Sequence, residues 1–230
     1  MALITTSDLA QSAVTDRRRP ATRWAPLTGI AFVVFFLGSV VASSPPSDKA
    51  SDAAWVANYT GHAHVTEHLV TGVLLILAAL SLLSFLSTTW TRIAGNRQVG
   101  AISPIPLVAA GVASACIAVG GVLMGAIAAT VQGTGHALDP ALLRFCNDVG
   151  FAMVGLPGML ATALSVAILS VQGRHTGLFG RKMMIFGLIV AVILLASLAF
   201  IPIVALLVWL VVTAVVLIRR PAVAAQSPTL

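Results

Sequence analysis

The chain has 230 residues, of which 58% are hydrophobic and 9% are charged. Soluble globular domains carry roughly 25% charged residues, so this composition excludes an ordinary soluble protein and predicts a surface that faces lipid. The net charge of +6 would suit a nucleic-acid-binding protein, but no basic stripe with interleaved aromatic residues occurs. We therefore do not expect nucleic acid as a partner.

Six apolar runs without Asp, Glu, Lys, Arg or His predict six transmembrane helices. They cover residues 26–43, 69–89, 104–130, 149–171, 183–200 and 203–218. Helices fit because the bilayer core offers no water to backbone groups and the runs lack the alternation of barrel strands. The expected fold is an all-α, polytopic membrane helix bundle over residues 23–220, between polar tails at 1–22 and 221–230.

Charged residues sort to opposite sides of these runs. Eleven of the thirteen Lys and Arg residues fall on one side, and five of the seven acidic residues fall on the other. Basic residues stay on the cytoplasmic side of a membrane. The sorting therefore predicts a multi-pass protein of the plasma membrane, in contact with the lipid bilayer, with both termini cytoplasmic and both tails mobile.

The first apolar run has an alternative interpretation as a signal peptide. An Arg cluster precedes it, and Val41-Ala42-Ser43-Ser44 resembles a cleavage site. The run is long for such a segment, and Pro45-Pro46 follows it closely. These features favour a first helix that is retained.

The connection 44–67 predicts a short helix lying on the outer membrane surface. Ser51 and Asp52 suit a helix start, and the helix is expected to continue to Tyr59. Trp55 and Tyr59 then share one helical face, because they are four residues apart.

Histidines gather just before the second run. His64 and His68 have the spacing by which a helix offers two imidazoles to one metal ion, and Glu67 adjoins them. A site for zinc, copper or haem would draw on the outer-side residues His62, His64, Glu67, His68 and His136. The alternative is a set of interfacial polar residues that cap the second helix and bind water.

Residues 64–68 also match the H-x-x-E-H motif of a class of zinc proteases. Five residues match easily by chance, and no acidic ligand on a downstream soluble domain follows. The sequence also lacks a P-loop, a G-x-S-x-G motif and a dinucleotide fingerprint. We therefore lean against an enzyme.

The third run carries small residues at one helical face. Gly121, Gly125 and Ala129 recur every four residues, which permits close approach of another helix backbone. The partner helix can belong to the same chain, to a second copy or to another membrane protein.

The fourth run begins with Asp139 as a helix N-cap and Pro140 at the first helical position. Arg144 and Asp148 follow one turn apart, and we expect them to form an ion pair at the outer face. Gly155-Leu156-Pro157-Gly158 predicts a kink, which serves packing or lines a pocket.

The last apolar stretch, Met183 to Ile218, is too long for one span. A single helix would measure about 54 Å against a core of about 30 Å. A turn near Phe200-Ile201-Pro202 would give two spans and return Arg219-Arg220 to the cytoplasm.

Three segments together resemble one family. They are the Ser-Asp-rich stretch 51–59 with its Tyr, Leu138–Arg144 leading to Asn147–Gly150, and the closing double span that ends in Arg219-Arg220. The family is a group of small actinobacterial six-helix membrane proteins catalogued as a domain of unknown function. The likeness covers roughly residues 26–220 and implies six spans in an actinobacterial plasma membrane. It implies no catalytic residue, and the histidine stretch is not part of it.

Three functions remain open at this point. The first is a non-catalytic accessory or scaffold subunit that packs against a larger membrane complex or forms a homo-oligomer. The second is a metal- or haem-binding protein with the outer-face histidines as ligands. The third is a carrier or binder of an apolar small molecule, with the Pro157 kink lining its pocket.

Overall fold

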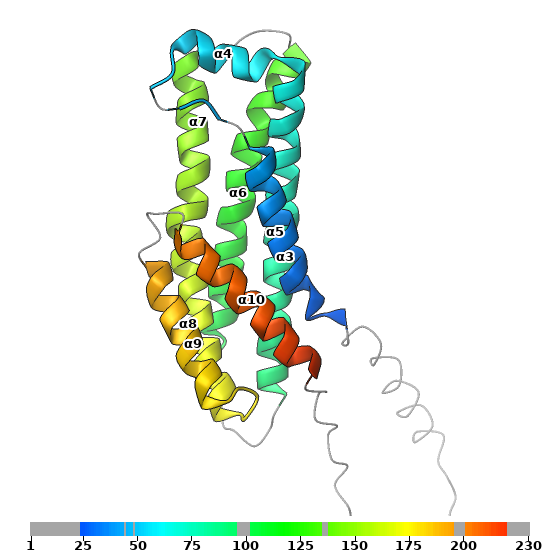
Figure 1. The fold of residues 1–230 in the computed structure, drawn as a ribbon, viewed down its shortest axis with the longest axis vertical. Coiled ribbons are helices and arrows are strands. Elements are labelled where there is room, and N and C mark those ends of the chain that lie inside the picture. The colour runs from blue at the N-terminus through cyan, green and yellow to red at the C-terminus, as the bar shows by residue number, and fades with distance from the viewer. Residues whose placement is uncertain are drawn as a thin grey trace, which may run out of the picture.

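The structure is a computed structural model that describes residues 24–43, 45–47, 49–95, 102–134, 138–195 and 201–219. Throughout these ranges the regular structure is helical, which confirms the all-α prediction there (Figure 1). The helices are α3 (Leu27–Ala42), α4 (Asp52–Thr60), α5 (His62–Ala94), α6 (Ile105–Thr134), α7 (Pro140–Met153), the π-helical turn η1 (Val154–Gly158), α8 (Met159–His175), α9 (Arg181–Leu195) and α10 (Ile201–Arg219). The predicted tails at 1–22 and 221–230 lie outside the described residues.

Four of the described helices are long and apolar enough to cross a membrane. They are His64–Ala94, Ile105–Thr134, the continuous rod Pro140–His175 and Pro202–Arg219. Leu27–Ala42 is apolar but shorter. The chain is therefore a membrane protein by the length and composition of its helices.

The long helices run side by side along the long axis, and α4 lies across one end of them (Figure 1). We call this the α4 end. α3 packs on α5, α9 packs on α8, and α10 packs on both α9 and α3. In Figure 1, α10 crosses the bundle obliquely and ends near the start of α3, at the end opposite α4.

Glycines allow α5 and α6 to touch through their backbones. A Cβ added to Gly72 would lie 2.7 Å from the carbonyl oxygen of Gly121 and 3.1 Å from Cα of Gly125. The small residues Gly121 and Gly125 thus meet a helix of the same chain, whereas Ala129 is exposed. This contact fixes the two central helices of the bundle.

Aromatic side chains fill the interior where α3, α5 and α10 meet. Phe32, Phe85 and Trp209 are fully buried, and the ring of Phe85 meets that of Trp209 edge-on at 6.3 Å. The outward faces carry exposed apolar side chains such as Val34, Val112 and Val192. Apolar side chains on both the inner and outer faces are what a lipid-facing helix requires.

The kink predicted at residues 155–158 takes the form of the π-helical turn η1. Pro157 lies inside it and has no backbone N–H, so it cannot make the regular helical hydrogen bond. The wider turn lets α7 and α8 continue as one rod.

Candidate functional site

The α4 end is closed by a short helix that begins at the predicted position. The Ser51 hydroxyl accepts a hydrogen bond from the backbone N–H of Ala54 at 3.3 Å, which makes Ser51 the N-cap. Trp55 and Tyr59 share the inner face of α4, are almost fully buried and stack at 6.4 Å. α4 therefore seals the end of the bundle against α5, α6 and α7.

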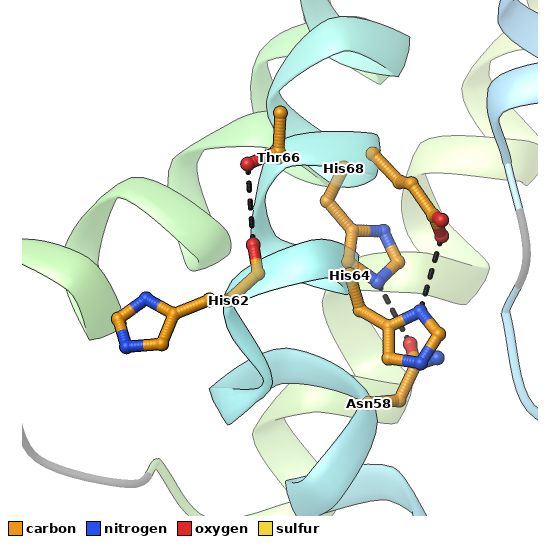
Figure 2. A network of polar contacts seen from close by, with 6 residues as sticks. Asn58, His62, His64, Thr66 and His68 are labelled. Carbon is orange, nitrogen blue, oxygen red and sulfur yellow. Dashed lines mark hydrogen bonds and ion pairs between the residues drawn. The ribbon is translucent and has the colours of Figure 1, made fainter.

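His68 joins α4 to α5. Its ring stacks on that of Tyr59 at 4.1 Å, with 4° between the ring planes. Its Nε2 lies 2.7 Å from Oδ1 of Asn58 (Figure 2). Because an amide oxygen only accepts, Nε2 carries the hydrogen and donates it. His68 is thus a buried structural contact between the two helices.

His62 and His64, the other two described histidines near the α4 end, face outward and differ from His68. His64 is exposed, and its Nδ1 lies 3.1 Å from Oε2 of Glu67. His62 is exposed too, and its ring points away from those of His64 and His68 in Figure 2. The backbone carbonyl of His62 accepts a hydrogen bond from the Thr66 hydroxyl at 3.1 Å.

The described residues do not supply the donor set of a metal centre. Within the described ranges, no three His, Cys, Asp or Glu side chains are placed to hold a metal ion together. Zinc or copper needs at least three such donors, and Nε2 of His68 is already bonded to Asn58. His136, the remaining predicted ligand, lies outside the described residues. The zinc, copper or haem site remains a prediction.

Arg144 holds the start of α4 on α7. Its Nη1 lies 2.6 Å from Oδ1 of Asp52, and its Nη2 donates to the carbonyl oxygen of Ala50 at 2.9 Å. Its Cζ lies 5.6 Å from the centre of the Trp55 ring. The predicted ion pair between Arg144 and Asp148 does not form among the described residues. Arg144 instead pairs with Asp52 of α4, which precedes it by ninety-two positions in the chain and lies beside it in the fold.

The Tyr59 hydroxyl is buried without a hydrogen-bond partner. Burial raises the pKa of Tyr59 to about 12, and the neighbouring Cys146 and Asp148 act in the same direction. Asp148 thus contributes to the electrostatics of Tyr59 instead of pairing with Arg144.

A cavity of about 320 Å³ lies between α3, α5, α6, α10 and the π-helical turn. The turn contributes Val154, Gly155 and Leu156, which immediately precede Pro157. Phe36 lines it from α3 and Ile203 from α10. No charged side chain among the described residues lines the cavity. An uncharged cavity of this size within a helix bundle suits an apolar small molecule.

The sequence indicated some of these residues and missed others. The Gly-Leu-Pro-Gly stretch predicted the kink that opens the cavity. Asn58 and Asp52 were missed as partners of His68 and Arg144, since both contacts bring together residues from separate helices. Thr71, which lines the cavity, was missed too. The only sign of it in the sequence was a polar residue within an apolar run.

Comparison of the chain with protein-family models, with curated proteins and with solved structures finds no match.

Proposed function

We propose that this chain is an integral plasma-membrane protein with six transmembrane helices that binds an apolar small molecule within the membrane. The observation that carries the proposal is the cavity of about 320 Å³ beside the π-helical turn. Ligand pockets typically enclose about 300–1,000 Å³, so the cavity is at the lower end of that range. π-Helical turns also occur frequently at functional sites.

Six spans follow when α3 and α9 are counted with the four longer helices. The ends of α3 and α10 that carry the termini lie together, opposite α4 (Figure 1). Basic residues at the ends of α5, α8, α9 and α10 support a cytoplasmic position for that end: Arg92, Arg174, Arg181, Lys182 and Arg219. The proposed topology places the α4 end, with Asp52 and Asp139, outside the cell.

We favour binding of a small molecule over an accessory role because the small-residue face of α6 already packs within the chain. The accessory-subunit prediction depended on the small-residue face of the third run, on spans without charged residues and on short loops. Gly121 and Gly125 are instead covered by α5 of the same chain. A scaffold role, a homo-oligomer and the actinobacterial family resemblance stay predictions.

Gly155 offers a direct test of ligand binding. A Cβ at Gly155 meets no atom within 4 Å, so Gly155→Leu places its side chain in the cavity without a backbone clash. Gly111→Leu is the matched control, because Gly111 also has open space around it but does not line the cavity. Both proteins would be purified into lipid nanodiscs and labelled with a photoreactive dodecane.

We expect the wild type and Gly111→Leu to be labelled on the cavity residues Phe36 and Phe151, and Gly155→Leu to lose that labelling. Labelling of lipid-facing residues such as Val112 should be equal in all three and serves as the internal control. If Phe36 and Phe151 are labelled in Gly155→Leu as strongly as in the wild type, the proposal is wrong.

A further inference from the structure

Thr71 marks one side of the cavity as polar. Its side chain lines the cavity and is 2% exposed, and its hydroxyl has no hydrogen-bond partner. Thr89 and Thr162, also buried in the bundle, bond the carbonyl oxygens one turn before them at 2.9 and 2.7 Å. Burying a hydroxyl without a hydrogen-bond partner is unfavourable, so a ligand that bonds to the Thr71 hydroxyl would remove this cost.

The polar lining residues gather towards the α4 end. Ser39 and Ser43 belong to the last turn and C-cap of α3, and Thr71 lies less than one turn beyond His68 on α5. The Ser39 hydroxyl is occupied by the carbonyl oxygen of Phe36 at 2.7 Å. Leu75, a turn further along α5, and Met124 give the rest of the cavity an apolar surface.

The lining also constrains the charge of a ligand. A carboxylate or ammonium group would lose its hydration without gaining a counter-charge, since the described lining is uncharged. A hydroxyl or carbonyl group loses much less and can bond to Thr71, because the threonine hydroxyl both donates and accepts.

We propose, building on the function proposed above, that the ligand is a neutral amphipathic molecule whose hydroxyl or carbonyl group bonds to Thr71. Its apolar chain then extends along Leu75 and Phe36 towards the middle of the bundle. In the proposed topology this is the orientation of an amphipathic molecule in the outer leaflet, with its polar group towards the α4 end.

The test compares three probes of equal chain length, namely dodecanol, dodecane and dodecanoate. Each competes with photoreactive dodecane for labelling of Phe36 and Phe151 in nanodiscs, with affinities expressed as mole fractions in the bilayer. We expect dodecanol to bind most tightly. Thr71→Val should weaken dodecanol roughly fivefold, the effect of one neutral hydrogen bond, and leave dodecane unchanged. Thr71→Ser should retain the preference for dodecanol.

Thr213→Val is the matched control, because Thr213 is a fully buried threonine without a hydrogen-bond partner that does not line the cavity. It should leave the affinities for all three probes unchanged. The inference is wrong if dodecanoate binds most tightly, or if Thr71→Val lowers the affinities for dodecane and dodecanol equally.

The two proposals fail in different ways. If dodecanol and dodecane bind equally and Thr71→Val has no effect, while Gly155→Leu still blocks labelling, the role of Thr71 is wrong and the cavity still binds apolar molecules. If Gly155→Leu leaves the labelling of Phe36 and Phe151 unchanged, the cavity is not the binding site and both proposals are wrong.

Discussion

Tyr59 is held by contacts on both sides of its ring. Trp55 stacks on it from within α4, and His68 stacks on it from α5. Its hydroxyl lies in the interior, where ionisation would leave a poorly solvated negative charge near Asp148. The protonation state of this one residue is therefore coupled to the packing of α4.

We expect the phenolate absorbance of the folded protein to appear with a midpoint near pH 12, because burial raises the pKa of Tyr59 to about 12 from 10.0. The chain contains one tyrosine, so a spectrophotometric titration in detergent measures Tyr59 alone. A midpoint at the ordinary value of the unfolded chain would mean that α4 does not bury it.

The same shift predicts an alkaline loss of stability. A pKa raised in the folded state means that the folded protein holds the proton of Tyr59 more tightly than the unfolded chain does. The resulting contribution to the free energy of unfolding is complete below pH 10 and is lost as the pH rises towards 12. Thermal unfolding measured between these pH values should reveal the loss in the wild type. Tyr59→Phe should lose this component of the pH dependence.

Arg144 and Asp52 should be energetically coupled, whereas Arg144 and Asp148 should not. The Asp52 side chain is 70% exposed, so the ion pair is expected to contribute about 0.2–1 kcal/mol. Double-mutant cycles with Arg144→Met, Asp52→Asn and Asp148→Asn, measured by thermal unfolding, give both coupling energies. A larger coupling to Asp148 would restore the pairing predicted from the sequence.

How much of the site the sequence can predict depends on the distance between the partners in the chain. The shared face of Trp55 and Tyr59 on α4 follows from helical spacing and was predicted, whereas the stacking of their rings was not. His64 and His68 share that spacing but have different environments, because Asn58 of the preceding helix bonds only His68. Periodicity within one helix carries no information about which side chain a second helix will meet.

At the scale of helices, the hydropathy runs located the elements but underestimated the length of α5. α5 has 33 residues, whereas its predicted span covered 69–89. The apolar run marks the part of a helix that lipid contacts, while the helix itself continues into polar residues such as those at 62–68. The predicted turn near Phe200-Ile201-Pro202 stays a prediction, because residues 196–200 lie outside the described residues and Ile201 and Pro202 belong to α10.

The contact between α5 and α6 should tolerate no side chain at Gly72. An added Cβ would lie 2.7 Å from the Gly121 carbonyl oxygen, which belongs to a helix backbone and cannot turn away as a flexible side chain would. We expect Gly72→Ala to destabilise the protein by about 1–3 kcal/mol, as overpacking does. Thermal unfolding in detergent measures the effect.

Gly133→Ala is the control for this substitution, because Gly133 lies on α6, the other helix of the pair, and a Cβ there meets no atom within 4 Å. It should be neutral or slightly stabilising, since alanine favours a helix more than glycine does. Equal stability of Gly72→Ala and Gly133→Ala would show that the two helices are further apart than described.

For the whole molecule, the proposed topology predicts which segments lie on each side of the membrane. A reporter fused after Ile218 should be active in the cytoplasm, and one inserted within residues 50–60 should be active outside. Both outcomes follow from the concentration of basic residues at the end opposite α4. An external signal from the fusion after Ile218 would contradict six spans with cytoplasmic termini.

Helix length also determines how far the protein extends from the bilayer. At 1.5 Å per residue the 33 residues of α5 measure about 50 Å, which exceeds the hydrocarbon core by about 20 Å. The polar start of α5, together with α4, accounts for part of this excess. In the proposed topology the α4 end thus extends beyond the hydrocarbon core.

The π-helical turn gives the chain a particular kind of evolutionary freedom. A π turn holds one residue more than an α turn, so α7 and α8 are offset by one position along a single rod. Loss of the codon for Pro157 would remove both the extra residue and the proline, and the rod could close into a regular helix with its flanking faces kept in register. A length change of one codon would therefore reshape the wall of the cavity that Val154, Gly155 and Leu156 form.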